Sequence, residues 1–184
     1  GDEHLMSSLF TVGETELATL GLARASGEAM KVLVGGLGLG YTAQAALTDH
    51  RVASVEVADA LEAVIDWHRD GLVPIGESLG TNPRCTLTHV DFFSLFDADP
   101  AGDDCWDVIL LDIEGLTRMR RWLTPGGVFA LWSDDAPDAA FVELLGQVFN
   151  APAAQVVPFA NPLTGDSSTC TIYVTGGQAS RPHI

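Results

Sequence analysis

The sequence predicts an α/β fold: a doubly wound, mostly parallel sheet with helices on both faces and an antiparallel hairpin at its C-terminal end. Two observations predict this fold class. Short apolar runs rich in β-branched residues alternate with stretches of helical periodicity, which is the pattern of β-α-β units. Most of these runs also lack the polar alternation of a half-exposed strand, as expected for parallel strands that are covered on both faces.

The elements follow in order along the chain. An opening helix is expected at residues 14–25, ahead of the first strand. Apolar runs predict five parallel strands, at residues 30–36, 51–59, 85–91, 106–112 and 126–133. Helical spacing follows the first, second and fifth of these strands, at residues 41–49, 60–70 and 138–149. Two final strands, joined by the turn-rich segment NPLTGDS, are expected to form the hairpin, at residues 154–160 and 168–176.

Length and charge narrow the class of protein. With 184 residues and 47% hydrophobic content the chain can bury a core, and we expect one domain over residues 1–184, with residues 1–27 as an N-terminal helical extension. The formal net charge of −16 opposes binding to nucleic acid and to anionic membranes. The same charge favours the approach of cationic small molecules, so we expect no nucleic acid and no membrane as partners.

The cysteines and the N-terminal residues indicate the compartment. Cys85, Cys105 and Cys170 are odd in number, far apart and without CxxC spacing, which argues against a disulfide framework and against a zinc site. The first ten residues are acidic where a signal peptide would be basic, and no apolar run approaches the roughly 20 residues of a membrane span. We therefore expect a cytoplasmic protein. His89 and Asp91 share a strand face but are too few to predict a metal site.

A glycine-rich segment, GGLGLG, follows the first strand and contains Gly35, Gly36, Gly38 and Gly40. Without side chains, the backbone can turn sharply there and approach a ligand closely before the next helix begins. In open α/β sheets, ligands bind beyond the carboxyl ends of the strands, beside the point where the strand order reverses. The segment therefore predicts a nucleotide-like ligand, and the domain is expected to bind a nucleoside.

Acidic residues end the next three strands. Asp59 lies nineteen positions after Gly40, where a carboxylate can accept hydrogen bonds from ribose hydroxyls, or can cap the following helix. Asp91 can accept a hydrogen bond from an adenine amino group, with Phe92 packing on the base, or can also cap a helix. Asp112 ends a central strand, where a carboxylate can orient or deprotonate an amine. Acids at three successive strand ends are more specific together than any one of them.

Other interpretations of these motifs stay open. The segment GLGYTA, residues 38–43, fits the GxGxxA form of the dinucleotide fingerprint, so an NAD-binding enzyme is one alternative. A nucleoside-binding protein that has no transfer activity and acts in an assembly is another. Trp132, near the end of the fifth strand, either packs in the core or flanks the pocket.

The segments VLVGGLGLGYTAQAAL, VASVEVADALEAVIDW, RCTLTHVDFFSLF and WDVILLDIEG together resemble the nucleoside-binding core of class I S-adenosylmethionine-dependent methyltransferases. Within that class the chain most resembles the spermidine synthase family, over roughly residues 28–175. The resemblance implies that residues 36–40 contact the methionine side of the ligand, Asp59 the ribose and Asp91 the adenine. It also implies that Asp112 lies beside an attacking amine.

This resemblance implies a transferase that uses S-adenosylmethionine or its decarboxylated form as co-substrate, with no metal. The acceptor would be a small amine, the reaction would belong to polyamine biosynthesis if the transferred group is aminopropyl, and the protein would be a homodimer. The chain departs from the family at Gly38, where the family carries an acid, and at DIEG, where the family has a longer DSSDP-like segment. The connection through Ile113 and Glu114 is also short. Methyl and aminopropyl transfer therefore stay as alternatives.

Overall fold

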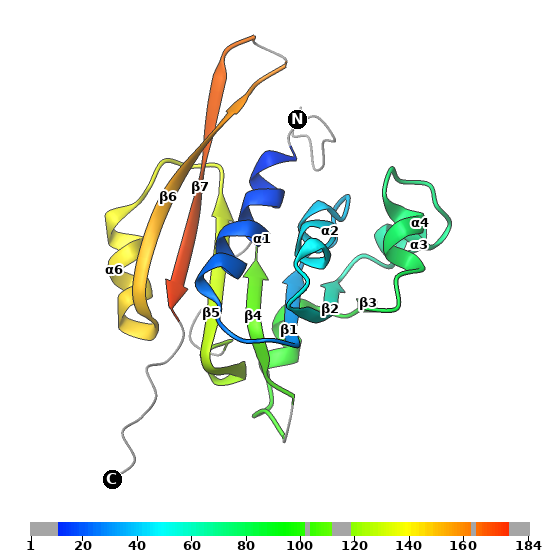
Figure 1. Cartoon of the computed structure of the whole chain (residues 1–184), viewed down its shortest axis with the longest axis horizontal. Coiled ribbons are helices and arrows are strands. Elements are labelled where there is room, and N and C mark those ends of the chain that lie inside the picture. The colour runs from blue at the N-terminus through cyan, green and yellow to red at the C-terminus, as the bar shows by residue number, and fades with distance from the viewer. Residues whose placement is uncertain (1–10, 102–103, 112–118, 163–164, 177–184) are drawn as a thin grey trace.

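The structure, a computed structural model, describes residues 11–101, 104–111, 119–162 and 165–176. The described strands are β1 (Met30–Gly35), β2 (Val52–Asp59), β3 (Cys85–His89), β4 (Trp106–Leu111), β5 (Leu123–Ser133), β6 (Asn150–Ala160) and β7 (Ser167–Gly176). They form one sheet in the order β3-β2-β1-β4-β5-β7-β6 (Figure 1). Strands β1 to β5 are parallel, and β7 is antiparallel to both β5 and β6. The predicted fold class, including the terminal hairpin, is confirmed.

Helices lie between the strands. The described helices are α1 (Val12–Arg24), α2 (Tyr41–Thr48), α3 (Glu62–Arg69), α4 (Gly76–Gly80), α6 (Ala139–Val148) and the 3₁₀ helices η1 (Phe92–Phe96) and η2 (Arg120–Trp122). Helices α1, α2, α3 and α6 were predicted from their periodicity. The sequence did not predict α4 or η2 and indicated η1 only through the capping alternative at Asp91, because three to five residues are too few to show a helical repeat.

Strand alternation divides the core into two layers. Along β1, Val32 and Val34 point to the face covered by α1, α2, α3 and α4, and Leu33 points to the opposite face, which η1 and α6 cover. Figure 1 shows α1 and α2 crossing the first of these faces. Because α1 contributes Leu17 and Leu22 to that layer, it is an integral part of the core. This helix lies within residues 1–27, the segment expected as an N-terminal extension.

The second face of the sheet is covered incompletely. The sequence predicted cover on both faces, but Ser54 of β2 and Thr86 of β3 are exposed, and Glu56 of β2 is half-buried. The reason is local, because β3 is followed by the five-residue η1, which is too short to lie across β2 and β3. The carboxyl half of this face is nevertheless buried, since Phe92 of η1 packs against Gly35. One corner of the sheet therefore presents polar side chains to solvent.

The β6–β7 hairpin forms one end of the sheet. Strand β5 pairs with β7 over the four residues Ala130–Ser133, whereas β6 pairs with β7 along its length. The far end of the hairpin therefore extends past β5 (Figure 1). Between Asn150 and Gly176 the one charged residue is Asp166, in a chain of net charge −16. The hairpin is thus a charge-poor surface on a strongly acidic protein.

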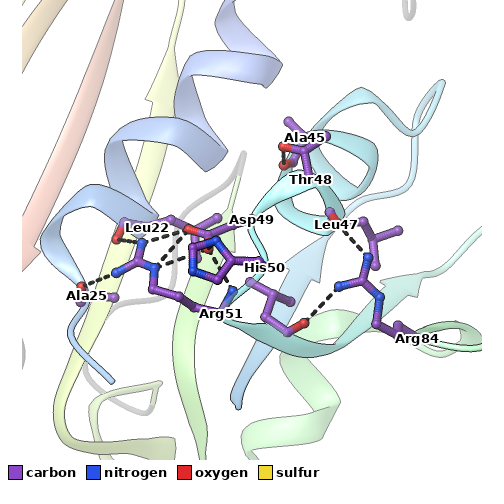
Figure 2. A network of polar contacts seen from close by, with 10 residues as sticks. Leu22, Ala25, Ala45, Leu47, Thr48, Asp49, His50, Arg51 and Arg84 are labelled. Atoms are coloured by element: carbon purple, nitrogen blue, oxygen red, sulfur yellow. Dashed lines mark hydrogen bonds and ion pairs between the residues drawn. The ribbon is translucent and has the colours of Figure 1, made fainter. Parts of the chain in front are cut away.

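Two arginines join the C-terminal ends of α1 and α2 to the amino ends of strands (Figure 2). Arg51 lies just before β2, and Arg84 lies just before β3. The Arg51 guanidinium donates to the carbonyl oxygens of Leu22 and Ala25, at 3.0 and 3.1 Å, and forms an ion pair with Asp49 at 2.6 Å. A cation at the C-terminus of α1 satisfies carbonyls that have no partner within the helix. The hydrogen bond from Arg51 holds the pKa of the Asp49 carboxyl below its usual value of 3.8. Arg84 binds the C-terminal part of α2 in a similar way, donating to Leu47 O at 2.7 Å.

Replacing Arg51 with alanine should lower the free energy of unfolding by about 2–3 kcal/mol, since several charge-assisted hydrogen bonds are lost together. Arg51→Lys keeps the charge but not the fork of donors, so it should fall between wild type and alanine. Because the pKa of Asp49 is lowered in the folded state, the pair stabilises above pH about 3.8 and this contribution is lost as the pH falls through the folded pKa. Urea denaturation of wild type and variants at neutral and at acid pH measures these free energies of unfolding. Equal stabilities of wild type and Arg51→Ala at neutral pH would contradict the assignment.

Candidate nucleoside-binding site

The glycine-rich segment forms the turn between β1 and α2. The sheet order places β1 between β2 and β4, so the turn lies where the strand order reverses. Gly36, Gly38 and Gly40 have φ angles of +88°, +49° and +89°, a region in which residues with side chains are strained. The hydrogen bond from Gly40 N to Leu37 O, at 2.7 Å, closes the turn. The turn therefore requires these three glycines for its backbone conformation.

Two of the glycines differ in what surrounds them. Gly35 is buried, and a Cβ atom there would lie 2.8 Å from Phe92 Cδ2 and would also overlap Leu111, so this glycine serves close packing. Gly36 is exposed, and no atom of the described residues lies within 4 Å of the place where its Cβ would be. A ligand can approach the backbone at Gly36 directly. The turn thus has a packed side at Gly35 and an open side at Gly36.

A cavity of about 90 Å³ adjoins the turn on the side of α1. Its lining includes Gly36, Tyr41, Glu14 of α1 and Trp132 of β5. A volume of this size holds a small group and not a whole nucleoside, for which several hundred Å³ are typical. The rest of a nucleoside would have to lie over the open side of the turn. The cavity therefore combines the glycine backbone with one carboxylate and two aromatic rings.

Asp59 connects the end of β2 to the glycine turn. Its Oδ2 accepts a hydrogen bond from Leu37 N at 2.7 Å, and its Oδ1 accepts one from Leu61 N at 2.7 Å. The second bond holds the chain just before α3, but Asp59 is not the cap of that helix, whose N-cap is Leu61 and which has no side-chain cap hydrogen bond. The first bond was not foreseen, and it holds the turn in place from the neighbouring strand. Each carboxylate oxygen keeps one lone pair, so Asp59 can still accept hydrogen bonds from a ligand.

Asp91 and Phe92 lie at the end of β3 and the start of η1. Asp91 caps η1, because its Oδ1 accepts a hydrogen bond from Phe93 N at 2.9 Å. Its side chain is exposed, and within the described ranges its other oxygen accepts no hydrogen bond. Phe92 is 7% exposed and packs its ring against Gly35 and Phe96. Phe92 thus supports the floor of the glycine turn, while the exposed oxygen of Asp91 is available to a ligand.

Asp112, the expected catalytic residue, lies outside the described residues. The residue before it, Leu111, ends β4 and is the Cα partner of Gly35. Within the part of the chain that the structure describes, no group of three or more His, Cys, Asp or Glu side chains is placed to hold a metal ion. No described helix combines the length and the hydropathy that crossing a membrane requires.

Glu14 was not predicted from the sequence as a site residue. Its only sequence signal is its position in the first turn of α1, which does not reveal that Glu14 lies beside the glycine turn. Trp132 was left between core packing and a place beside the pocket, and it does both, because it lines the cavity and packs against the buried core. Gly13 of α1 lies directly against the Trp132 indole ring.

This contact predicts an effect of Gly13→Ala. The added Cβ would lie 2.8 Å from Trp132 Cδ1 and nearer still to Nε1, so α1 or the indole ring has to move. We expect a loss of about 1–3 kcal/mol in the free energy of unfolding. Gly146→Ala in α6 is the matched control, since its nearest neighbour, Pro152 Cγ, lies at 3.6 Å and higher helix propensity should stabilise it by about 0.5–1 kcal/mol. Denaturation of both variants tests the contact, and a fully stable Gly13→Ala would disprove it.

Comparison with known proteins supports this description of the fold. No family model matches the sequence. The structure is similar to spermidine synthase from Thermotoga maritima, with a TM-score of 0.72 at 16% identity, over 91% of this chain and 59% of that one. It is also similar to precorrin-6y C5,15-methyltransferase from Geobacter metallireducens, with a TM-score of 0.67 at 14% identity, over 97% and 95% of the two chains.

A third similar structure is a SAM-dependent O-methyltransferase from Thermotoga maritima, with a TM-score of 0.60 at 14% identity, over 91% of this chain and 66% of that one. The chain spans about three fifths of the length of the spermidine synthases that it matches. These identities are low, so the likeness concerns the arrangement of the elements. The chain has the class I methyltransferase-like fold.

Proposed function

We propose that this protein binds S-adenosylmethionine or its decarboxylated form at the glycine turn and transfers a methyl or aminopropyl group to a small amine. The observation that carries the proposal is the open backbone at Gly36, which lies at the reversal of strand order and is held by the bond from Leu37 N to Asp59. No Cβ fills this space, so a nucleoside can lie against the backbone.

Each described site residue has a role in this proposal. Asp59 accepts hydrogen bonds from the ribose hydroxyls with the lone pairs that Leu37 and Leu61 leave available. The exposed oxygen of Asp91 accepts a hydrogen bond from the adenine amino group. The small cavity beside Gly36 takes the group attached to sulfur, and Glu14 gives that cavity a carboxylate suited to positive charge. Glycine-turn residues therefore contact the donor, and α1 closes one side of the site.

In this reaction the protein itself forms no covalent bond to the donor or to the amine. The donor supplies an electrophilic carbon on a positively charged sulfur, which leaves with the electron pair as a neutral thioether when the amine nitrogen takes the carbon. The amine must reach the carbon unprotonated and in line with the bond that breaks. In the proposal Asp112 accepts a hydrogen bond from the amine and then its proton. The net charge of −16 favours the approach of a cationic amine to the protein.

Two experiments test the proposal. Calorimetric titration should show S-adenosylmethionine or its decarboxylated form binding more tightly than NAD. Mass spectrometry of products, with putrescine offered together with each donor, should show the gain of one aminopropyl or one methyl group. Asp112→Asn should abolish that gain, whereas Asp70→Asn, at the exposed end of α3, should not.

The other outcomes distinguish the alternatives. Tighter binding of NAD would overturn the proposal in favour of an NAD-dependent enzyme. Tight nucleoside binding without transfer to any amine would favour a non-catalytic binding protein. Methylation of a different acceptor would keep the methyl form of the proposal and reject the aminopropyl form.

We also propose that the chain forms a homodimer through the face of the β6–β7 hairpin. Two copies of net charge −16 repel each other least where charge is scarce, and the hairpin carries Asp166 alone between Asn150 and Gly176. Val156, on β6, is 47% exposed and gives the hairpin an apolar contact. Sedimentation should give a species of about twice 19.5 kDa that Val156→Asp dissociates. A monomer of the wild-type protein would refute this arrangement.

A further inference from the structure

A second and larger cavity lies on the uncovered face of the sheet, toward the amino ends of the strands. Its volume is about 380 Å³, within the range of small-molecule sites. The residues that matter to its chemistry are Lys31, Ser54, Glu56, Asp104, Trp106 and Trp122. Lys31 and Ser54 are Cα partners near the start of β1 and β2, whereas the glycine turn follows the other end of β1. The two cavities are therefore at opposite ends of the strands.

Aromatic rings form one wall of this cavity. Trp106 and Trp122 are stacked with their ring centroids 5.4 Å apart and an interplanar angle of 30°. Phe96 supports both rings edge-on, with centroids at 6.3 Å from Trp106 and 6.1 Å from Trp122. Trp106 is buried and Trp122 is half-buried, so the packing holds both indoles. An indole ring carries negative charge density on its face and attracts cations.

Glu56 supplies a carboxylate on the floor of the cavity. It lies between Val55 and Val57, which point to the layer beneath α2 and α3, so its own side chain points to the opposite, uncovered face. Thr88 Oγ1 donates to Glu56 Oε1 at 3.3 Å. Within the described part of the chain, Glu56 Oε2 accepts no hydrogen bond. A half-buried carboxylate with one open oxygen favours a ligand that can donate.

The charges around the cavity determine whether it favours a cationic, an anionic or a neutral ligand. Glu56 and the exposed Asp104 are negative, and among the described lining residues Lys31 supplies the one positive charge. An anion would meet two carboxylates, and a neutral ligand without a donor would cover Glu56 Oε2 and leave it without a hydrogen bond. A cation that also has hydrocarbon surface satisfies both the carboxylate and the indole rings.

We propose that this cavity binds a small organic cation, a protonated primary amine with an apolar portion. Its ammonium group donates to Glu56 Oε2, its carbon chain lies against Trp106 and Trp122, and Asp104 adds attraction at the rim. The proposal uses no residue of the glycine turn, so it does not depend on the function proposed above.

The test uses butylammonium as the probe and follows the four tryptophan indole N–H signals by two-dimensional NMR, each assigned with a Trp→Phe variant. Butylammonium should shift the signals of Trp106 and Trp122 saturably, while those of Trp67 and Trp132 stay unchanged. Its neutral counterpart 1-butanol, at matched ionic strength, should produce no saturable shift. Equal shifts with 1-butanol would overturn the role of charge, and the absence of any saturable shift with butylammonium would overturn the site.

Variants locate the binding. Glu56→Gln should raise the Kd for butylammonium at least about tenfold, and Glu62→Gln, a matched change at an exposed position of α3, should leave it unchanged. Asp104 is exposed, so Asp104→Asn should fold normally and raise the Kd about two- to threefold. Gly36→Ala should leave the Kd unchanged, which separates this cavity from the nucleoside site. Unaltered affinity in both Glu56→Gln and Asp104→Asn would overturn the proposal.

Discussion

Gly36→Ala should weaken the binding of S-adenosylmethionine at least tenfold while the protein still folds. The backbone at Gly36 has φ +88°, where a residue with a Cβ costs about 1–2 kcal/mol, and this sets the expected loss of stability. No atom of the described residues lies within 4 Å of the added Cβ, so their packing is undisturbed. The Cβ instead projects into the space through which a ligand approaches the turn. Calorimetric titration and urea denaturation measure the two effects separately.

Gly126 provides the matched control for this change. It has φ +86° and also has no atom of the residues that the structure describes within 4 Å of its would-be Cβ, but it lies near the amino end of β5, away from the glycine turn. Gly126→Ala should therefore lose a similar amount of stability without any loss of nucleoside affinity. If Gly36→Ala bound the nucleoside as tightly as wild type, the ligand could not lie against this backbone.

Asp59→Ala should produce the second large effect, on stability and on affinity together. The variant loses two carboxylate hydrogen bonds of 2.7 Å, to Leu37 N and Leu61 N, and should lose about 2–4 kcal/mol in the free energy of unfolding. If the carboxylate also binds the ribose, the affinity for S-adenosylmethionine should fall by about 1.5–3 kcal/mol. Denaturation and titration give the two values. Hydrogen exchange at the Leu37 and Leu61 amides should become faster.

Asp91→Ala is the comparison for Asp59→Ala. Asp91 also ends a strand, but its side chain is exposed and accepts one backbone hydrogen bond, from Phe93 N. Loss of this hydrogen bond in Asp91→Ala should lower the free energy of unfolding by about 0.5–2 kcal/mol, as for other helix caps. If Asp59→Ala proved no less stable than Asp91→Ala, the link from β2 to the glycine turn would contribute nothing to the fold.

The fold could be predicted from the sequence because its signals are local. The residues from Val32 to Val34 are buried on both faces of a parallel sheet, so the sequence of this strand is continuously apolar. The uncovered corner of the sheet could not be predicted in the same way. Whether Ser54 and Thr86 are exposed depends on η1 being five residues long, and a single turn of helix has no periodicity to reveal its length.

The site was predicted in part. The need for glycine at Gly36 follows from residue type and spacing alone. The hydrogen bond between Asp59 and Leu37 joins residues 22 positions apart, so it appears once β1 and β2 are paired in register. Phe92 was expected to pack on a base, and its ring lies in the core, where it packs beneath Gly35 at the start of η1. The role of Asp112 stays a prediction, outside the described residues.

The prolines of β6 have a consequence for how the protein behaves at high concentration. In the order of the sheet β6 is a terminal strand, with β7 as its one neighbour among the described strands, and an unpaired strand edge can recruit strands from other molecules. Pro152 and Pro158 lie within β6 and have no amide hydrogen to offer to an incoming strand. Growth of the sheet from one molecule into the next is therefore blocked along this edge. The charge-poor hairpin can present apolar surface to a partner without seeding fibrillar aggregation.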